Sequence, residues 1–276
     1  MDTDARRRVW DGVADGYAAA EARGEEQLGA VAEWFIEVAD PHAGHVILDL
    51  AAGAGALSHQ LARSVDTDVS IICSDFAPGM VEAARAIGAD AGLTNIEYRV
   101  LDAEQLDLEP DSVDVVLCRS ALMLMPDVPA ALAEARRVLR PGGVYACSVF
   151  SNPASNPWVV TPLRVFVERG LIEPPMPNGP GMFALGSPGT LDQVMVAAGF
   201  DEVDVRPIDF TFRWADDDAM WRVLAEINAR LKPVIAAMDA EEKSSTREAV
   251  AGAFAAFRHD DGAFEVPAQV LAATGR

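Results

Sequence analysis

The chain has 276 residues, which is long enough for one large domain or for a domain with a substantial insertion. Its 43 Asp and Glu residues outnumber its 22 Lys and Arg residues, so the formal net charge is −21. Such a chain repels phosphate backbones, and we expect no nucleic-acid partner. No apolar run approaches the roughly 20 residues of a membrane-spanning helix. The first ten residues lack the apolar stretch of a secretory signal, so a cytoplasmic location is predicted.

The first 150 residues are predicted to form a helical cover followed by a parallel sheet. Residues 1–45 form the cover, with helices at Arg8–Tyr17 and Glu25–Val38. Residues 46–150 alternate short apolar runs with amphipathic stretches, as in a parallel sheet whose strands are buried on both faces. Strands are predicted at Val46–Leu50, Val69–Ser74, Ile96–Leu101, Val113–Cys118 and Gly143–Phe150. Helical spacing predicts helices at Ala56–Ser64, Met80–Ala91 and Val128–Leu139.

The composition changes after Phe150. Residues 151–189 are rich in proline, so we expect an insertion that acts as a lid. Residues 190–215 complete the sheet, and residues 216–276 are predicted to be a C-terminal helical segment. Within residues 190–215 we predict a helix at Thr190–Ala198 and strands at Glu202–Arg206 and Asp209–Trp214. The fold class is α/β: a doubly wound, Rossmann-like, seven-stranded and mostly parallel sheet with helices on both faces and a helical, Pro-rich cap.

The sequence VILDLAAGAGALS, residues 46–58, is the most informative in the chain. A strand ends, a loop of very small residues follows, and a helix begins. Missing side chains let a ligand lie against the backbone, and the start of a helix offers unpaired N–H groups. The pattern indicates a nucleotide-like ligand at the carboxyl end of the strand. A tight strand-to-helix turn that needs small residues only for packing is the alternative.

Charged side chains follow the next strands in the same way. Asp75 follows the second strand, about 20 residues beyond the loop, where a carboxylate can accept hydrogen bonds from both hydroxyls of a ribose. Asp102 follows the third strand, and Arg119 follows the fourth. Because the carboxyl ends of parallel strands meet at one edge of a sheet, we expect these residues to lie near Asp49.

The stretch from Val46 to Phe150 resembles the class I S-adenosylmethionine-dependent methyltransferases, particularly the branch similar to quinone-biosynthesis C-methyltransferases. The matching segments occur in the right order and spacing, and they are LDLAAGAG, SDFAPGMVEAAR, LDAEQL, VDVVLCRSALMLMPD, LRPGG and the later AAGFDEVDV. The resemblance implies S-adenosylmethionine as the cofactor and a small-molecule methyl acceptor as the partner.

The resemblance also assigns residues to parts of the cofactor. It implies that the loop from Asp49 to Gly55, including Ala51 and Gly53, holds the methionine part, and that Asp75 binds the ribose. The other implied contacts are Phe76 and Met80 near the adenine, Asp102 at its amino group, the Ala103 backbone beside the ring, Arg119 and Ser120 beneath the cofactor, and Tyr17 over its methionine end.

Two departures from the family pattern bear on the site. Ala51 and Ala52 stand where family loops commonly carry glycine and cysteine, and we expect Ala51 to fit with a negative φ. The segment Leu122–Leu124 stands where a histidine or two often occur, which removes one possible base and makes the site more apolar. Tyr17 is the remaining candidate for a catalytic base, because each histidine of the chain suits a surface or structural role better.

The acceptor pocket is predicted between the sheet edge, the N-terminal helices and the Pro-rich insertion. Met123, Trp158 and Phe183 are its predicted lining, which suits an apolar or aromatic acceptor. A sulfonium methyl group is already an activated electrophile, so in-line positioning of the two reactants is the main expected source of catalysis.

Two alternatives remain open. The fold could bind the cofactor and catalyse a non-methylating reaction or act as a binding partner, since binding does not prove transfer. An NAD(P)-dependent oxidoreductase shares the architecture, but its G-x-G-x-x-G/A fingerprint would end here on Ser58.

Cysteine and metal chemistry are not indicated. Cys73, Cys118 and Cys147 lie at or near the ends of apolar runs, and no two have the spacing of a zinc or redox pair. We interpret them as buried strand cysteines. No cluster of His, Asp or Glu has metal-ligand spacing, so no metal site is predicted.

Overall fold

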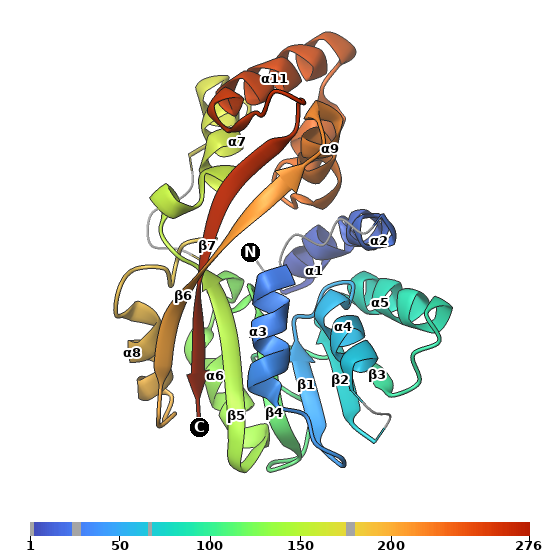
Figure 1. The fold of residues 1–276 in the computed structure, drawn as a ribbon, viewed down its shortest axis with the longest axis vertical. Helices are drawn as coiled ribbons and strands as arrows, with labels where there is room; N and C mark the ends of the chain where they lie inside the picture. The colour runs from blue at the N-terminus through green and yellow to red at the C-terminus, as the bar shows by residue number, and fades with distance from the viewer. Residues whose placement is uncertain (1–2, 24–28, 66–67, 175–179) are drawn as a thin grey trace.

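The computed structural model of the protein describes residues 3–23, 29–65, 68–174 and 180–276. Seven strands form one sheet in the order β3-β2-β1-β4-β5-β7-β6 (Figure 1). Strands β1 to β5 are parallel, and β7 runs antiparallel between β5 and β6. This confirms the predicted seven-stranded, mostly parallel α/β sheet. The strands are β1 (Val46–Leu50), β2 (Ser70–Asp75), β3 (Ile96–Val100), β4 (Val113–Arg119), β5 (Leu139–Phe150), β6 (Asp204–Trp214) and β7 (Phe264–Gly275).

Helices cover both faces of the sheet. In Figure 1, α3 (Gly29–Ala39) lies in front of the strands and α6 (Val128–Val138) behind them. The remaining covering helices are α4 (Ala56–Ser64), α5 (Pro78–Asp90) and α8 (Thr190–Ala197). Between these layers the central strands are almost wholly buried, as their continuous apolar runs require. The three cysteines lie in this buried sheet as free thiols, as predicted.

The last two strands differ from the sequence-based prediction. The predicted break between Glu202–Arg206 and Asp209–Trp214 does not exist, because β6 runs continuously through Pro207. An edge strand tolerates a proline, since the missing N–H faces no second partner. The predicted C-terminal helical segment was wrong for its last residues, which form β7. Its side chains alternate in burial, but Pro267 and several alanines hide that period in the sequence.

The first of the two helices predicted for the N-terminal cover is divided in two. The helix predicted at Arg8–Tyr17 divides into α1 (Thr3–Asp11) and α2 (Ala14–Ala22), with a break at Gly12. Both helices pack on α5. The first residues of the helix predicted at Glu25–Val38 lie outside the described residues, and α3 accounts for the rest.

A second, smaller core lies beyond the sheet. Its buried residues come from α7 (Pro157–Glu168), α9 (Asp217–Arg222), the π-helical turn η3 (Val223–Ile227), α10 (Lys232–Ala237), α11 (Ala240–Ala253) and the adjoining ends of β6 and β7. We call this part the cap. In Figure 1 the long β6–β7 hairpin rises out of the sheet into the cap, and α1 and α2 lie between the two parts. The carboxyl edge of the parallel strands therefore faces a roof made of these helices.

Candidate functional site

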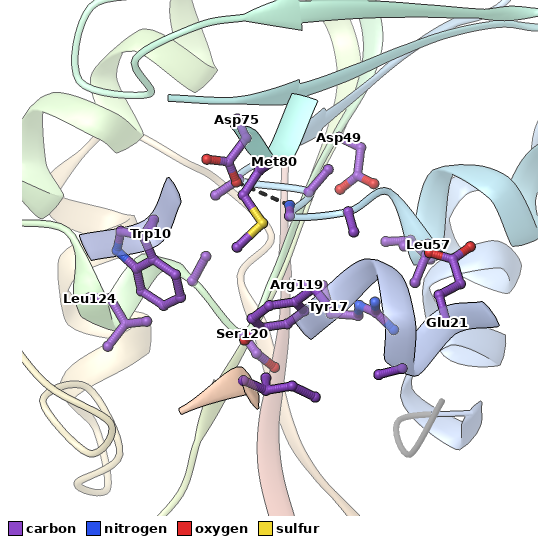
Figure 2. A pocket seen from close by; sticks show the side chains of 18 of the residues that line it. Trp10, Tyr17, Glu21, Asp49, Leu57, Asp75, Met80, Arg119, Ser120 and Leu124 are labelled. Atoms are coloured by element: carbon purple, nitrogen blue, oxygen red, sulfur yellow. Dashed lines mark hydrogen bonds between the residues drawn. The ribbon is translucent and has the colours of Figure 1, made fainter. Parts of the chain in front are cut away.

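A cavity of about 560 Å³ lies between the sheet edge, the N-terminal helices and the cap. Its floor is at the ends of β1 and β4, where the strand order reverses direction. Ligands of open α/β sheets bind at this kind of switch point. Figure 2 shows side chains from the strand ends and from α2 converging on the cavity.

Asp49 lies at the base of the cavity in an almost dry environment. Its side chain is 1% exposed, and Oδ2 accepts a hydrogen bond of 2.7 Å from the hydroxyl of Ser58 on α4. Oδ1 is buried and has no hydrogen-bond partner among the described residues. Burial raises the pKa of Asp49 to about 6, although the hydrogen bond from Ser58 and the charge of Arg119 oppose that rise. An unpaired buried acceptor of this kind is costly unless a ligand supplies a donor.

Asp75 ties the end of β2 to the loop after β1. One carboxylate oxygen accepts a hydrogen bond from the backbone N–H of Gly53 at 3.0 Å (Figure 2). The other accepts one from the backbone N–H of Ala77 at 2.9 Å. Burial raises the pKa of Asp75 to about 6. Gly53 has a φ of 58°, and a Cβ built on it would meet nothing within 4 Å. The loop thus keeps an open space beside a carboxylate that has lone pairs left for a ligand.

The loop conformation corrects the prediction for Ala51. Ala51 has a φ of 53°, in the left-handed region, whereas we expected a negative φ. An L-residue with a Cβ is strained there, and such strain is concentrated at functional loops.

Replacing Ala51 by glycine is expected to stabilise the protein by about 0.5–1 kcal/mol, because glycine adopts a positive φ without the steric cost. Equilibrium urea unfolding measures the change. Ala52→Gly is the matched control, since Ala52 does not share the positive φ and glycine there only adds freedom to the unfolded chain. Ala52→Gly should destabilise the protein, and an equal response of the two variants would contradict the assignment of strain to Ala51.

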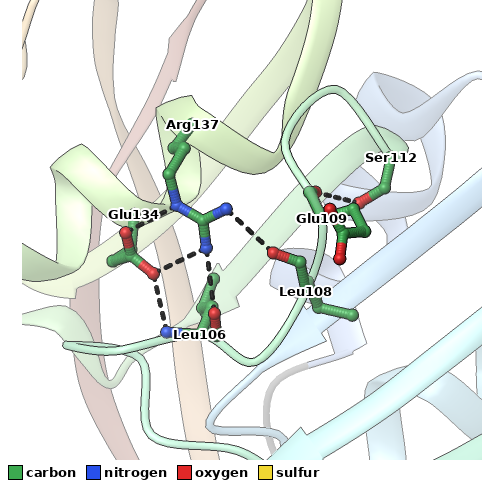
Figure 3. A network of polar contacts seen from close by, with 6 residues as sticks. All are labelled: Leu106, Leu108, Glu109, Ser112, Glu134 and Arg137. Carbon is green, nitrogen blue, oxygen red and sulfur yellow. Dashed lines mark hydrogen bonds and ion pairs between the residues drawn. The ribbon is translucent and has the colours of Figure 1, made fainter.

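The loop after β3 brings Asp102 and Ala103 to the cavity. Asp102 accepts a hydrogen bond from the backbone N–H of Glu104 at 3.0 Å through Oδ1. The far end of this loop is held by α6, as Figure 3 shows. Arg137 donates to the carbonyls of Leu106 and Leu108, and Glu134 accepts from the backbone N–H of Leu106.

The ion pair between Glu134 and Arg137 closes this network. The two side chains lie 2.7 Å apart, and the hydrogen bond from Arg137 lowers the pKa of Glu134 below its usual value. A charged pair with several hydrogen bonds on each partner fixes its geometry. The loop that carries Asp102 is therefore anchored to the scaffold.

The end of β4 and helix α2 complete the centre of the site. Figure 2 shows the rings and side chains of Tyr17, Arg119 and Ser120 close together, with Met80 directed into the cavity from α5. Ser120 is held by Ser148 of the neighbouring strand β5, whose hydroxyl accepts from its backbone N–H at 3.0 Å.

Most of the predicted residues lie around this one cavity. They are Tyr17, Asp49, Ala51, Gly53, Asp75, Phe76, Met80, Asp102, Ala103, Arg119, Ser120 and Trp158. Residues that are far apart in the sequence, from α2 to the cap, thus share one lining.

Three predicted residues do not line the cavity. Gly55 is packed instead, because a Cβ there would lie 2.8 Å from the ring of His59 and 3.0 Å from Ala84. Met123 is fully buried in the main core, and Phe183 packs against that core. The apolar positions next to them in sequence line the cavity in their place: Leu124, Met125 and Met182.

Several lining residues were missed by sequence reasoning. Glu21 lies on the same face of α2 as Tyr17, four residues on, so its spacing was a usable signal. Its carboxylate binds the buried His59 ring at 2.7 Å through Oε1. Trp214 and Arg222 belong to β6 and α9 of the cap, and no local pattern placed those elements over the sheet. Trp10 and Phe212 also line the cavity.

The described part of the chain has neither a membrane-spanning helix nor a metal-binding cluster. Within residues 3–23, 29–65, 68–174 and 180–276, no helix is both long and apolar enough to cross a membrane. The same residues contain no group of three or more His, Cys, Asp or Glu side chains that could hold a metal ion.

An open α/β sheet with a ligand-sized cavity and acidic residues at its switch point is typical of an enzyme that uses a nucleotide-type cofactor. The methyltransferase-domain family matches residues 41–163. Nocamycin O-methyltransferase of Saccharothrix syringae is 31% identical over 209 residues, which cover 72% of this chain and 75% of that protein. A ubiquinone/menaquinone biosynthesis C-methyltransferase of Cellvibrio japonicus is 34% identical over 119 residues, 43% of this chain and 48% of that protein.

A solved structure shows the same fold at lower identity. The YcgJ protein of Bacillus subtilis aligns with a TM-score of 0.58 and 20% identity, covering 88% of this chain and 96% of that one. The chain belongs to the class I S-adenosylmethionine-dependent methyltransferases, and its cofactor is S-adenosylmethionine. The residues present fit that group for two reasons. The unpaired Oδ1 of Asp49 can accept a hydrogen bond from a cationic group, and the open space at Gly53 lets a ligand lie against the backbone.

Proposed function

We propose that this enzyme transfers the methyl group of S-adenosylmethionine to a small apolar or aromatic acceptor that binds under the cap. The observation that carries the proposal is the division of one cavity into two unlike halves. Acidic side chains at the strand ends line one half, and the aromatic residues Phe150, Trp158 and Phe212 line the other. The two halves suit a polar cofactor and an apolar partner. Relatives named for nocamycin and for quinone biosynthesis support a small-molecule acceptor.

The proposed cofactor contacts follow from the free acceptor atoms. Asp49 Oδ1 would accept a hydrogen bond from the ammonium group of the methionine part, beside the loop from Ala51 to Gly53. Asp75 would accept from the two ribose hydroxyls. Asp102 would accept from the adenine amino group through its second oxygen, with Ala103 beside the ring. Phe76 and Met80 would cover the ring, and Arg119 and Ser120 would lie beneath the cofactor.

S-adenosylmethionine supplies a methyl group that its sulfonium has already activated. The protein then has to align the acceptor atom, the methyl carbon and the sulfur, and such positioning can remove about 7–11 kcal/mol of barrier. The cap covers the sheet edge, and α2 places Tyr17 over the centre of the site (Figure 2). Where the acceptor must lose a proton, the Tyr17 hydroxyl is the candidate base.

The test of this function uses the purified protein, S-adenosylmethionine and S-adenosylhomocysteine. Calorimetric titration should show micromolar binding of both, and NAD(P) should not compete. Acceptor candidates are then screened for release of S-adenosylhomocysteine together with a mass gain of one methyl group. Cofactor binding with no methylated product from any acceptor would favour the non-methylating alternative, and binding of NAD(P) alone would overturn the proposal.

Ionisation of Asp49 alone is expected to raise cofactor affinity about tenfold between pH 5 and pH 7. Burial raises the pKa of Asp49 to about 6, and only its carboxylate form attracts an ammonium group. The attraction is therefore complete well above pH 6 and is lost as the pH falls through 6.

The stability of the unliganded protein should change in the opposite direction. A raised acid pKa means that folding takes up a proton, so this contribution to stability is lost as the pH rises through 6.

Titrations at pH 5, 6 and 7 measure the cofactor effect, and Asp49→Asn is its control. The asparagine cannot ionise, so the pH dependence of that variant should be about tenfold smaller than that of the wild type, and what remains reports on Asp75, whose pKa burial also raises to about 6. A pH dependence as steep in Asp49→Asn as in the wild type would remove Asp49 from the ammonium site.

A further inference from the structure

The part of the cavity lining that comes from residues 121–227 carries charge of one sign. The acidic lining residues, which include Asp49, Asp75 and Asp102, all come from the first 104 residues of the chain. From residue 121 to residue 227, the charged residues among the described lining are Arg213 and Arg222. In a protein with 43 acidic and 22 basic residues, a stretch of lining whose charged side chains are both cations favours an anionic ligand.

A buried donor lies in the same half. Trp214, at the end of β6, is 5% exposed and lines the cavity, and its ring packs against Phe212 and Phe254. Its indole Nε1–H has no hydrogen-bond partner among the described residues. An indole nitrogen can only donate, and a buried donor without an acceptor is costly. A ligand oxygen in the cavity would remove that cost.

The two arginines of this half differ in their surroundings. The side chain of Arg213 is 73% exposed and pairs with Glu265 at 3.2 Å, so its charge is directed to the surface. Arg222 ends helix α9, eight residues after Trp214, and is half-buried. Its guanidinium presents donors in a planar fork that matches a carboxylate.

We propose that the methyl acceptor is an aromatic or similarly flat apolar molecule that carries a carboxylate, bound by Arg222 and by the indole N–H of Trp214. The inference rests on the proposed function, since it assumes that the cap half of the cavity holds the acceptor. Trp158, Phe212 and Phe150 contact the apolar body, and the carboxylate is oriented toward α9. The carboxylate thereby fixes which end of the acceptor faces the methyl group.

The test compares acids with their neutral amides on the protein saturated with S-adenosylhomocysteine. Benzoate, 2-naphthoate and anthracene-2-carboxylate are titrated beside the corresponding carboxamides. At least one acid should bind tenfold or more tightly than its amide, because the free energy of a hydrogen bond to a charged group in a buried site is large enough for a tenfold difference in affinity. Equal binding of acid and amide in all three pairs, or binding of none of the acids, would overturn the proposal.

Variants connect the preference to the two residues. Arg222→Gln should abolish the preference for the acid, and Trp214→Phe, which keeps an aromatic ring, should reduce acid binding several-fold. Arg164→Gln is the matched control. It removes the same positive charge, but Arg164 lies exposed on α7, outside the cavity. An acid preference that survives in Arg222→Gln would contradict the assignment.

The same samples separate this inference from the proposed function. Each variant is titrated with S-adenosylhomocysteine first, and its affinity should stay within about threefold of the wild-type value. Loss of cofactor binding in the wild-type protein would reject the proposed function. Intact cofactor binding without an acid preference would reject the carboxylate alone.

Discussion

Replacing Asp75 by alanine is expected to weaken the binding of S-adenosylmethionine by about a hundredfold or more. Each hydrogen bond from a ribose hydroxyl to a buried carboxylate contributes about 1.5–3 kcal/mol, and two are proposed. The variant also removes the acceptors for the backbone N–H groups of Gly53 and Ala77, so the loop loses its anchor to β2. Calorimetric titration with S-adenosylmethionine measures the affinity directly.

The fold should survive this substitution. A raised pKa shows that burial disfavours the charged form of Asp75, so removing the carboxylate also removes a desolvation cost. Asp75→Asn keeps one carbonyl acceptor and should lose less affinity than Asp75→Ala. Asp90→Ala is the control, because Asp90 is exposed at the end of α5, away from the cavity. A folded Asp75→Ala protein that binds within threefold of wild type would reject the ribose assignment.

The cofactor half of the site could be predicted because its signals are local. Asp49, Asp75 and Arg119 each come at or next to the end of an apolar strand, and parallel strands place such ends at one edge. The loop composition then indicated a ligand. The backbone angle of Ala51 could not be predicted, because an alanine gives no local sign of a left-handed conformation that tertiary contacts impose.

The acceptor half could not be predicted in the same way. Its residues lie on the cap, whose core combines segments more than 100 residues apart, from Val165 to Ala268. A helical stripe such as that of α9 shows that a face is buried but does not show what it is buried against. Trp214 and Arg222 therefore gave no signal. Met123 and Phe183 each lie one residue away from a residue that lines the cavity, Leu124 and Met182. Met123 is in a single 3-10 turn and Phe183 is in a turn, and segments this short show no periodic pattern that tells which side chain faces the cavity.

Helix α2 is the element that joins the two halves of the site, and Gly16 is the residue that allows it. A Cβ at Gly16 would lie 2.2 Å from the backbone carbonyl oxygen of Glu226 in η3 of the cap. Arg23 also binds the Glu226 carboxylate at 2.9 Å, while the other side of α2 packs on α5. The cover over the cofactor thus depends on a close approach between two backbones.

Gly16→Ala is expected to lower the affinity for S-adenosylhomocysteine by tenfold to a hundredfold. The methyl group cannot be accommodated by a side-chain rotation, because its neighbour is backbone, so α2 must move away from η3 and carry Tyr17 and Glu21 out of the cavity. A site that loses the cover of Tyr17 and admits water there loses roughly 1.5–3 kcal/mol, as for exposing one large side chain, which corresponds to this range.

Gly252→Ala separates this effect from the general preference of helices for alanine. Gly252 lies in α11, and a Cβ there would meet nothing within 4 Å, so the substitution should stabilise the protein by up to about 1 kcal/mol and leave cofactor affinity unchanged. Hydrogen exchange of the α2 amides should speed up in Gly16→Ala and not in Gly252→Ala. If Gly16→Ala keeps the wild-type affinity and the hydrogen exchange of its α2 amides is unchanged, α2 does not hold the cofactor in place. The cap alone would then have to cover the cofactor.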